Sequence, residues 1–107
     1  MEFSVLVTFD LNYCKTTEYR VMERTLTDLG FETSSDRSGL DLPSNTYLGV
    51  VEVADVVLDI DDIKLGAEGA INLISTKLRN AIKAVGKTGK FYVTASPKSM
   101  TVDYCSR

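Results

Sequence analysis

Asp10 is the acidic residue whose position in the chain most favours chemistry. It comes directly after an apolar run in which every second side chain is large and apolar: Phe3, Val5, Val7 and Phe9. That alternation predicts a β-strand with one buried face. Ligands of open α/β sheets gather outside the carboxyl ends of strands, so a carboxylate at this place could contact one. Position alone equally allows Asp10 to cap a loop.

A second set of residues that could take part in binding or catalysis is basic. It surrounds the end of the helix predicted for the second half of the chain, and it consists of Lys77, Arg79, Lys83, Lys87 and Lys90. Cations near the C-terminus of a helix are often only its solvated side, where they complement the helix dipole. The alternative is contact with the backbone of a nucleic acid. The sequence leaves both interpretations open.

Charge is divided unevenly along the chain. Residues 1–62 contain thirteen acidic and four basic residues, whereas residues 63–107 contain two acidic and eight basic ones. This division predicts either association of opposite surfaces or a basic surface for a polyanion. The net charge of −3 argues against strong non-specific DNA binding by the monomer.

The residue types that are missing restrict the chemistry further. The 107 residues include no histidine, which excludes His-dependent serine and cysteine hydrolases and leaves carboxylates, lysines, tyrosines, thiols or a hard metal ion. Cys14 and Cys105 form neither a CxxC pair nor a metal-ligand spacing, so two free thiols are expected. No apolar run approaches the roughly 20 residues that span a bilayer, and no signal-peptide pattern is visible. A cytoplasmic location is therefore expected, with no membrane partner.

Two apparent motifs fail on their spacing. Residues 86–88 (Gly-Lys-Thr) resemble the end of a phosphate-binding loop, but Ala81 stands where that loop needs glycine. Residues 59–62 (Asp-Ile-Asp-Asp) resemble the start of a calcium loop, but Lys64 and Ala70 occupy the positions that need glycine and glutamate. The acidic run is therefore interpreted as a solvated surface.

Two helices are predicted from apolar residues at three- and four-residue spacing. The first is capped at Thr16 or Thr17 and ends at Gly30. The second runs from about Glu68 to Val85, and Gly86 ends it in the same way. The acidic segment at residues 54–65 has an ambiguous pattern and is interpreted as a connection into the second helix.

Four strands are predicted around these helices. The strand that leads to Asp10 is followed by a weak edge strand at residues 31–35 and by a strand from Thr46 to about Val53. Gly49 inside that third strand marks either a bulge or close packing by another element. The fourth strand covers residues 91–95, and the tail at residues 100–104 could add a short fifth strand.

The order β-α-β-β-α-β predicts a single α+β domain of ferredoxin-like fold over residues 1–107. Its four-stranded antiparallel sheet would have the first and third strands in the centre and both helices on one face. The other face would carry Leu6, Thr8, Tyr92 and Thr94. An uncovered face with apolar side chains favours association, so a homodimer is predicted.

Three short segments resemble a known family. They are residues 5–11 (Val-Leu-Val-Thr-Phe-Asp-Leu), 28–31 (Asp-Leu-Gly-Phe) and 42–49 (Leu-Pro-Ser-Asn-Thr-Tyr-Leu-Gly). Together they look like the second CRISPR-associated protein and its VapD-like and orphan relatives, a superfamily of small ferredoxin-fold proteins that pair through their sheets. The likeness extends from residue 3 to about residue 95. The acidic segment at residues 54–65 is a departure from the compact CRISPR-associated form.

The resemblance implies a role for Asp10. In catalytically active relatives, the aspartate that ends the first strand comes from both protomers and holds a divalent metal ion for phosphodiester hydrolysis, and Mg²⁺ suits such hard ligands. Many other relatives are structural or regulatory. The favoured hypothesis is an orphan regulatory or adaptor dimer linked to nucleic acids. A metal-dependent endoribonuclease or nuclease, with the basic set as its RNA or DNA contact, is the alternative, and a small-molecule-binding domain is the third.

Overall fold

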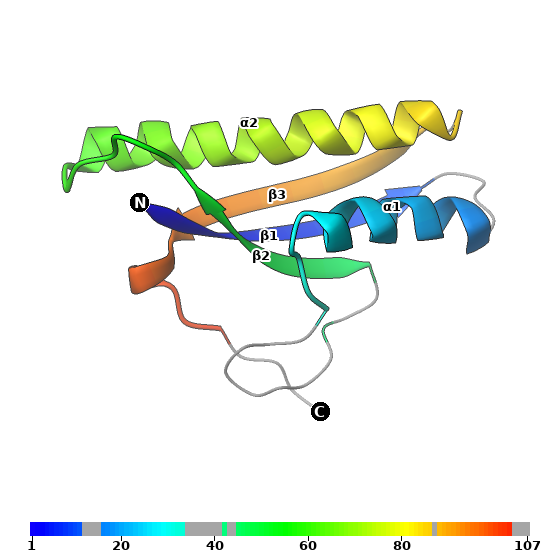
Figure 1. Cartoon of the computed structure of the whole chain (residues 1–107), viewed down its shortest axis with the longest axis horizontal. Helices are drawn as coiled ribbons and strands as arrows, with labels where there is room; N and C mark the ends of the chain where they lie inside the picture. The colour runs from blue at the N-terminus through cyan, green and yellow to red at the C-terminus, as the bar shows by residue number, and fades with distance from the viewer. Residues whose placement is uncertain (12–15, 34–41, 43–44, 87, 104–107) are drawn as a thin grey trace.

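The computed structural model describes residues 1–11, 16–33, 42, 45–86 and 88–103 (Figure 1). In chain order these form β1 (Glu2–Leu11), α1 (Thr16–Asp28), β2 (Thr46–Glu52), α2 (Ile60–Ala84), β3 (Gly89–Pro97) and the short 3₁₀ helix η1 (Lys98–Met100). The fold is α+β, as predicted.

The three described strands form one antiparallel sheet in the order β2-β1-β3. β1 lies in the centre, as predicted, because Val7 pairs with Tyr47 of β2 on one side and with Val93 of β3 on the other. Both neighbouring strands therefore bond to the backbone of β1, which makes it the most strongly held strand of the sheet.

The predicted edge strand at residues 31–35 is represented by a single bridge. Glu32 and Leu48 exchange both backbone hydrogen bonds, with N···O distances of 2.7 and 2.8 Å. Because the N–H and C=O of one residue point to the same side of a strand, this bridge lies on the edge of β2 that faces away from β1. Residues 34 and 35 lie outside the described residues, so the predicted four-stranded sheet is not shown.

The possible fifth strand at residues 100–104 is not formed in its described part. Residues 98–100 form η1, residues 101–103 have no regular structure, and Tyr104 lies outside the described residues. The backbone N–H of Thr101 donates to the carbonyl of Lys98 (3.2 Å), and its hydroxyl donates to the carbonyl of Pro97 (2.7 Å). These local bonds close a turn in place of an extended strand.

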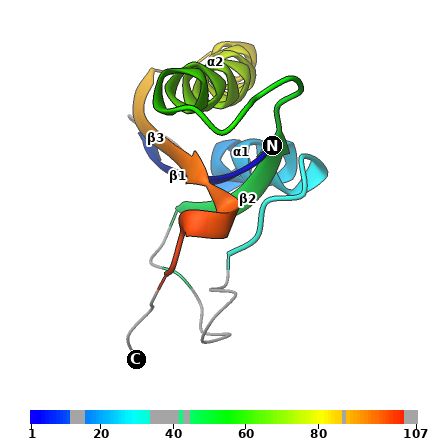
Figure 2. The ribbon, with the colours of Figure 1, turned by 90° about the vertical axis from the view of Figure 1, so that its left-hand side faces the viewer.

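Both helices pack on the same face of the sheet, with η1 on the other side (Figure 2). The core joins every second side chain of β1 to the apolar stripes of the two helices; its members include Phe3, Val5, Val7, Phe9, Met22, Leu26, Ile74, Leu78 and Ile82. The predicted alternation of β1 is thus confirmed. Leu29 and Val93 are half-buried at the margin of this core.

The start of α2 is the largest error of the sequence prediction. The helix begins at Ile60, well before Glu68, so the second half of the acidic segment interpreted as a connection, residues 60–65, is the helix itself. Asp59 is its N-cap, and the Asp59 carboxylate accepts a hydrogen bond from the backbone N–H of Asp62 (3.3 Å). The acids of this run lie where a helix N-terminus favours negative charge, so they initiate the helix as well as facing solvent.

Gly49 marks close packing and not a bulge. A Cβ atom at this position would lie 2.3 Å from Cδ1 of Phe31, whose ring is buried over β2. The register from Thr46 to Glu52 against β1 is uninterrupted.

The predicted ends of the two helices are confirmed, because Gly30 and Gly86 both have positive φ, at 85° and 69°.

Candidate functional site

Asp10 lies at the carboxyl end of the central strand, as the sequence predicted. It is exposed, and the burial alternation of β1 places it on the face opposite the helices, with Leu6 and Thr8. Its cross-strand partner in β3 is Lys90. A carboxylate and an ammonium group therefore stand on neighbouring strands at this end of the open face.

The Asp10 carboxylate also has a partner from α1. The hydroxyl of Tyr19 donates to Oδ1 of Asp10 (3.2 Å) and accepts a hydrogen bond from the backbone N–H of Leu11 (3.3 Å). The Tyr19 ring stacks on Phe9 with 6.0 Å between centroids. These contacts tie the end of β1 to α1, so Asp10 has a structural partner whatever its further role. Sequence reasoning missed this contact, because the apolar spacing that predicts the helix does not record polar partners.

The described residues include no group of three or more acidic, cysteine or histidine side chains that could hold a metal ion together. Mg²⁺ usually keeps several water ligands and needs only one or two protein carboxylates. Asp10 from each of two protomers would meet that requirement. The donor chemistry of Asp10 therefore fits Mg²⁺, with one carboxylate in a single copy of the chain and two where an assembly brings two copies together.

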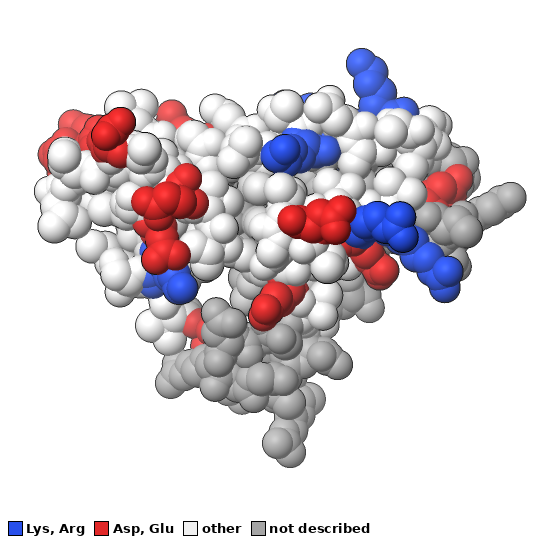
Figure 3. Space-filling model, viewed as in Figure 1, with Lys and Arg blue, Asp and Glu red and all other residues white. Residues whose placement is uncertain are grey.

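Among the predicted basic residues, Lys77 and Arg79 lie on different sides of α2. Lys77 borders a shallow hollow between the helices together with Asp28 of α1, whereas the guanidinium of Arg79 lies 5.8 Å from the ring centre of Phe91 in β3. Lys83, in the last turn of α2, and Lys90 are exposed, and Lys87 lies outside the described residues. On the face drawn in Figure 3, basic side chains stand in separate groups. The Lys77 side of α2 and the Arg79 side therefore contact different parts of the molecule.

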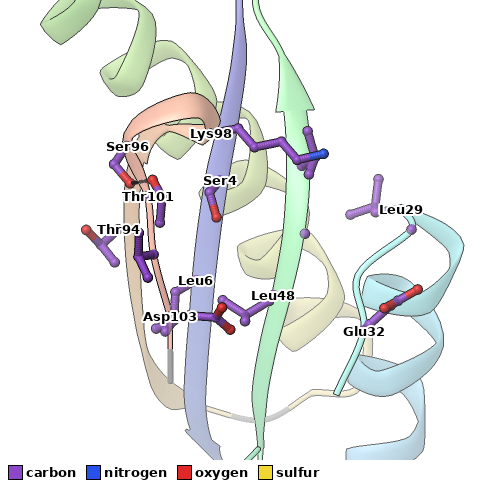
Figure 4. A pocket seen from close by; sticks show the side chains of 14 residues that line it. Ser4, Leu6, Leu29, Glu32, Leu48, Thr94, Ser96, Lys98, Thr101 and Asp103 are labelled. Carbon is purple, nitrogen blue, oxygen red and sulfur yellow. Dashed lines mark hydrogen bonds between the residues drawn. The ribbon is translucent and has the colours of Figure 1, made fainter. Parts of the chain in front are cut away.

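The open face of the sheet carries a groove of about 700 Å³ (Figure 4). Its floor is formed by the side chains of three strands that point away from the helices, and η1 and the residues after it border one side. The lining includes Ser4, Leu6, Leu48, Val50, Thr94, Ser96, Lys98, Thr101 and Asp103. Ser96 and Thr101 are joined by a hydrogen bond between their hydroxyls. The groove is thus a mixed surface of aliphatic side chains and hydroxyl groups.

The prediction for this face is confirmed in outline. Leu6 and Thr94 line the groove, and Tyr92 and Thr8 lie on the same face outside it. Sequence reasoning missed Leu48 and Val50, although the alternation around the buried Tyr47 would have found both. It also missed the bordering residues 101–103, because it assigned them to a strand.

Comparison with protein-family models, with curated proteins and with solved structures finds no match to this chain. Neither described helix is at once long enough and apolar enough to cross a membrane. Arguments about function therefore rest on the residues and geometry of this chain.

Proposed function

We propose that this chain is a regulatory or adaptor protein that acts as a homodimer and pairs through the open face of its sheet. The observation that carries the proposal is the unequal covering of the sheet. Both helices lie on one face, while the other presents Leu6, Leu48, Val50 and Tyr92 with partly or largely exposed side chains. Apolar groups on one continuous strand surface are typical of an interaction site.

The proposal includes a ferredoxin-like topology. The bridge between Glu32 and Leu48 supports it, since a strand at that edge would give the order edge strand-β2-β1-β3. This is the strand order of a ferredoxin-like sheet with its two helices on one face. The resemblance of residues 5–11, 28–31 and 42–49 to the CRISPR-associated and VapD-like superfamily points to the same topology and to pairing through the sheets.

Pairing through this face is physically reasonable. Each square ångström of apolar surface removed from water contributes about 25 cal/mol, and a stable interface commonly buries roughly 800 Å² on each partner. The hydroxyls of Ser4, Thr94 and Ser96 would need partners or retained water in such an interface. The mixed lining of the groove therefore favours an interface with a polar component over a wholly apolar one.

Sedimentation velocity and light scattering test this assembly. The parent protein is expected to be a dimer at micromolar concentration, and Val50→Lys and Tyr92→Lys should each raise the dissociation constant by about tenfold or more. Leu73→Lys is the matched control, because Leu73 is an exposed aliphatic residue on α2. A parent protein that stays monomeric at high micromolar concentration would refute the proposal. Loss of the dimer in the control alone would place the interface elsewhere.

A metal-dependent endoribonuclease is the second candidate, and one observation favours it. Asp10 lies on the same open face, at the end of the central strand, so pairing through this face could bring two copies of Asp10 together. A bound Mg²⁺ would supply a Lewis acid and an activated water, which a chain without histidine otherwise lacks. Lys83 in the last turn of α2 and Lys90 in β3 are exposed cations, and they would contact RNA or DNA backbone.

Two variants separate this second candidate from a structural role for Asp10. Asp10→Asn removes the charge, whereas Tyr19→Phe keeps the charge and removes its hydrogen bond. If Asp10 binds metal, Mg²⁺ should raise the melting temperature of the parent and of Tyr19→Phe but not of Asp10→Asn, and only Asp10→Asn should lose RNA cleavage. If Asp10 only ties β1 to α1, both variants should lose about 1 kcal/mol at most and Mg²⁺ should shift none of the melts.

A further inference from the structure

The start of α2 exposes an unusual number of large aliphatic side chains. Within nine residues of the chain, four are mostly exposed: Val57 (62%), Leu58 (84%), Ile60 (72%) and Leu65 (65%). We call residues 55–68 the acidic-apolar end. A single exposed aliphatic side chain is normal in a soluble protein, but four so close together in the chain indicate a contact surface. Around the exposed side of α2, Ile60 and Leu65 flank the acidic Asp61 and Glu68. The open face of the sheet is formed by other residues, so this is a separate surface.

The acidic-apolar end is held in a fixed conformation. The carboxylate of Asp62 accepts a hydrogen bond from the backbone N–H of Val57 (2.6 Å), which fastens the preceding segment to the first turn of the helix. Gly66 lies so close to the sheet that a Cβ atom there would be 2.8 Å from Cζ of Phe3. The exposed side chains therefore stand on a scaffold that is anchored to the core, and little conformational entropy would be lost on binding.

The charge around these side chains is negative. The acidic-apolar end has five acidic residues (Asp55, Asp59, Asp61, Asp62 and Glu68) and one basic residue (Lys64), which gives a net charge of −4. Asp59 and Asp62 are engaged in the hydrogen bonds that start the helix. Acidic side chains gather over this end of α2 in the space-filling view (Figure 3). A partner for this surface must complement both features, the aliphatic groups and the negative charge.

These features discriminate between kinds of partner. Aliphatic side chains alone could enter a lipid bilayer, but a net charge of −4 opposes an anionic membrane surface and a nucleic acid equally. A second copy of the chain could offer Lys83 and Lys90, but its exposed residues at the end of α2 are mostly polar. Such a head-to-tail contact would also be open-ended and would favour fibres. A basic segment with an apolar side satisfies every condition.

We infer that the acidic-apolar end binds a basic amphipathic helix of a partner protein. The apolar side of that helix would cover Leu58, Ile60 and Leu65, and its lysine or arginine residues would flank the carboxylates of Asp55 and Asp61. Amphipathic helices commonly bind through anchors at helical spacing, and complementary charge fixes their orientation and raises the association rate. The surface is independent of the interface proposed for the homodimer.

A fluorescent Leu/Lys peptide with all its leucines on one helix face is the probe. Its binding to the whole chain can be measured by anisotropy and located by backbone-amide chemical shifts. We expect Leu58→Ser combined with Leu65→Ser to weaken binding by about tenfold or more, as for anchor residues of an interface. Asp61→Asn should weaken it by about two- to fivefold and reduce its dependence on salt. Leu73→Ser and Asp28→Asn are the matched controls and should leave binding unchanged.

Control peptides and variants make the inference refutable. A peptide of the same composition without an apolar side, and one with glutamate in place of lysine, should both bind at least about tenfold more weakly. Equal binding of all three peptides, or equal losses in the matched controls, would overturn the inference. Self-association of the free chain, or binding to anionic vesicles, that the double variant abolishes would assign the surface to a second copy or to a membrane instead. Melting curves confirm that each variant is folded.

Discussion

The two faces of β1 differ in what covers them. On one face Phe3, Val5 and Val7 are fully buried under α1 and α2. On the other, Ser4 and Leu6 are half-buried and Asp10 is exposed. Both faces belong to the same strand and share the same backbone hydrogen bonds. The difference therefore arises from the helices and not from the sheet.

This difference divides the roles of the side chains. Side chains on the helix-covered face are closely packed, so changing their size affects folding directly. Side chains on the open face contribute less to the stability of one chain and are available for contact with another. Substitutions on the two faces should therefore separate stability from association.

The largest expected effect on the helix-covered face is that of Leu78→Ala. Leu78 is fully buried in the core, and its truncation should lower the free energy of unfolding by about 2–5 kcal/mol. Leu73→Ala on the same helix is the control, because Leu73 is about half exposed and should lose less than about 1 kcal/mol. Urea denaturation followed by circular dichroism measures both. A loss below half a kcal/mol for Leu78→Ala would mean that α2 does not pack on the sheet through this residue.

Much of this packing could be predicted from the sequence, because periodicity reports which side is buried. The alternation of β1 and the stripes of α1 and α2 identified most of the core correctly. Periodicity failed where local bonds decide the conformation. Asp59 and Asp62 begin α2 through capping bonds, and Thr101 closes a turn in the tail. Both segments were assigned from their apolar patterns, which do not record such bonds.

The candidate site was predictable only in part, for a related reason. The side of β1 on which Asp10 lies follows from alternation along the strand. Its contact with Tyr19 depends on how α1 is rotated and placed against β1, and no local pattern fixes that placement. Lys77 and Arg79 are two residues apart on α2, so their spacing already places them on nearly opposite sides of the helix. What each side contacts depends on tertiary packing and could not be foreseen.

Gly49→Ala tests the close packing of the helix-covered face by adding a single methyl group. The new Cβ would point to the helix-covered face and collide with the Phe31 ring, so a loss of about 1–3 kcal/mol is expected. Gly69→Ala is the matched control, because a Cβ atom there would meet nothing within 4 Å and alanine favours helix by up to about 1 kcal/mol. In thermal melts, Gly49→Ala is expected to lower the melting temperature and Gly69→Ala to raise it. Destabilisation by both substitutions would show that backbone conformation, and not contact with Phe31, controls the response.

The smallest expected effect concerns the ionisation of Tyr47. Because Tyr47 lies on the helix-covered face, its contribution to stability should depend on pH, unlike that of a tyrosine on the open face. Burial on the helix-covered face raises the pKa of Tyr47 above its ordinary value of 10.0, and the negative charge of Glu23 raises it further. Because the folded chain holds the phenolic proton more tightly than the unfolded chain, this contribution to stability is complete below pH 10. It is lost as the pH rises through the folded-state pKa. The free energy of unfolding should therefore fall more steeply above pH 10 in the parent than in Tyr47→Phe.

Two variants assign the cause of that alkaline decline. Tyr92→Phe changes a tyrosine that is 63% exposed on the open face. The free energy of unfolding of this variant should therefore fall above pH 10 as steeply as that of the parent. Glu23→Gln removes the charge but keeps the burial, and should make the decline slightly shallower, since burial is the larger cause. Urea denaturation at intervals from pH 8 to about pH 11 would measure these slopes. Equal slopes in Tyr47→Phe and the parent would show that Tyr47 gains no protection from the helix-covered face, and the contrast between the faces would then rest on packing alone.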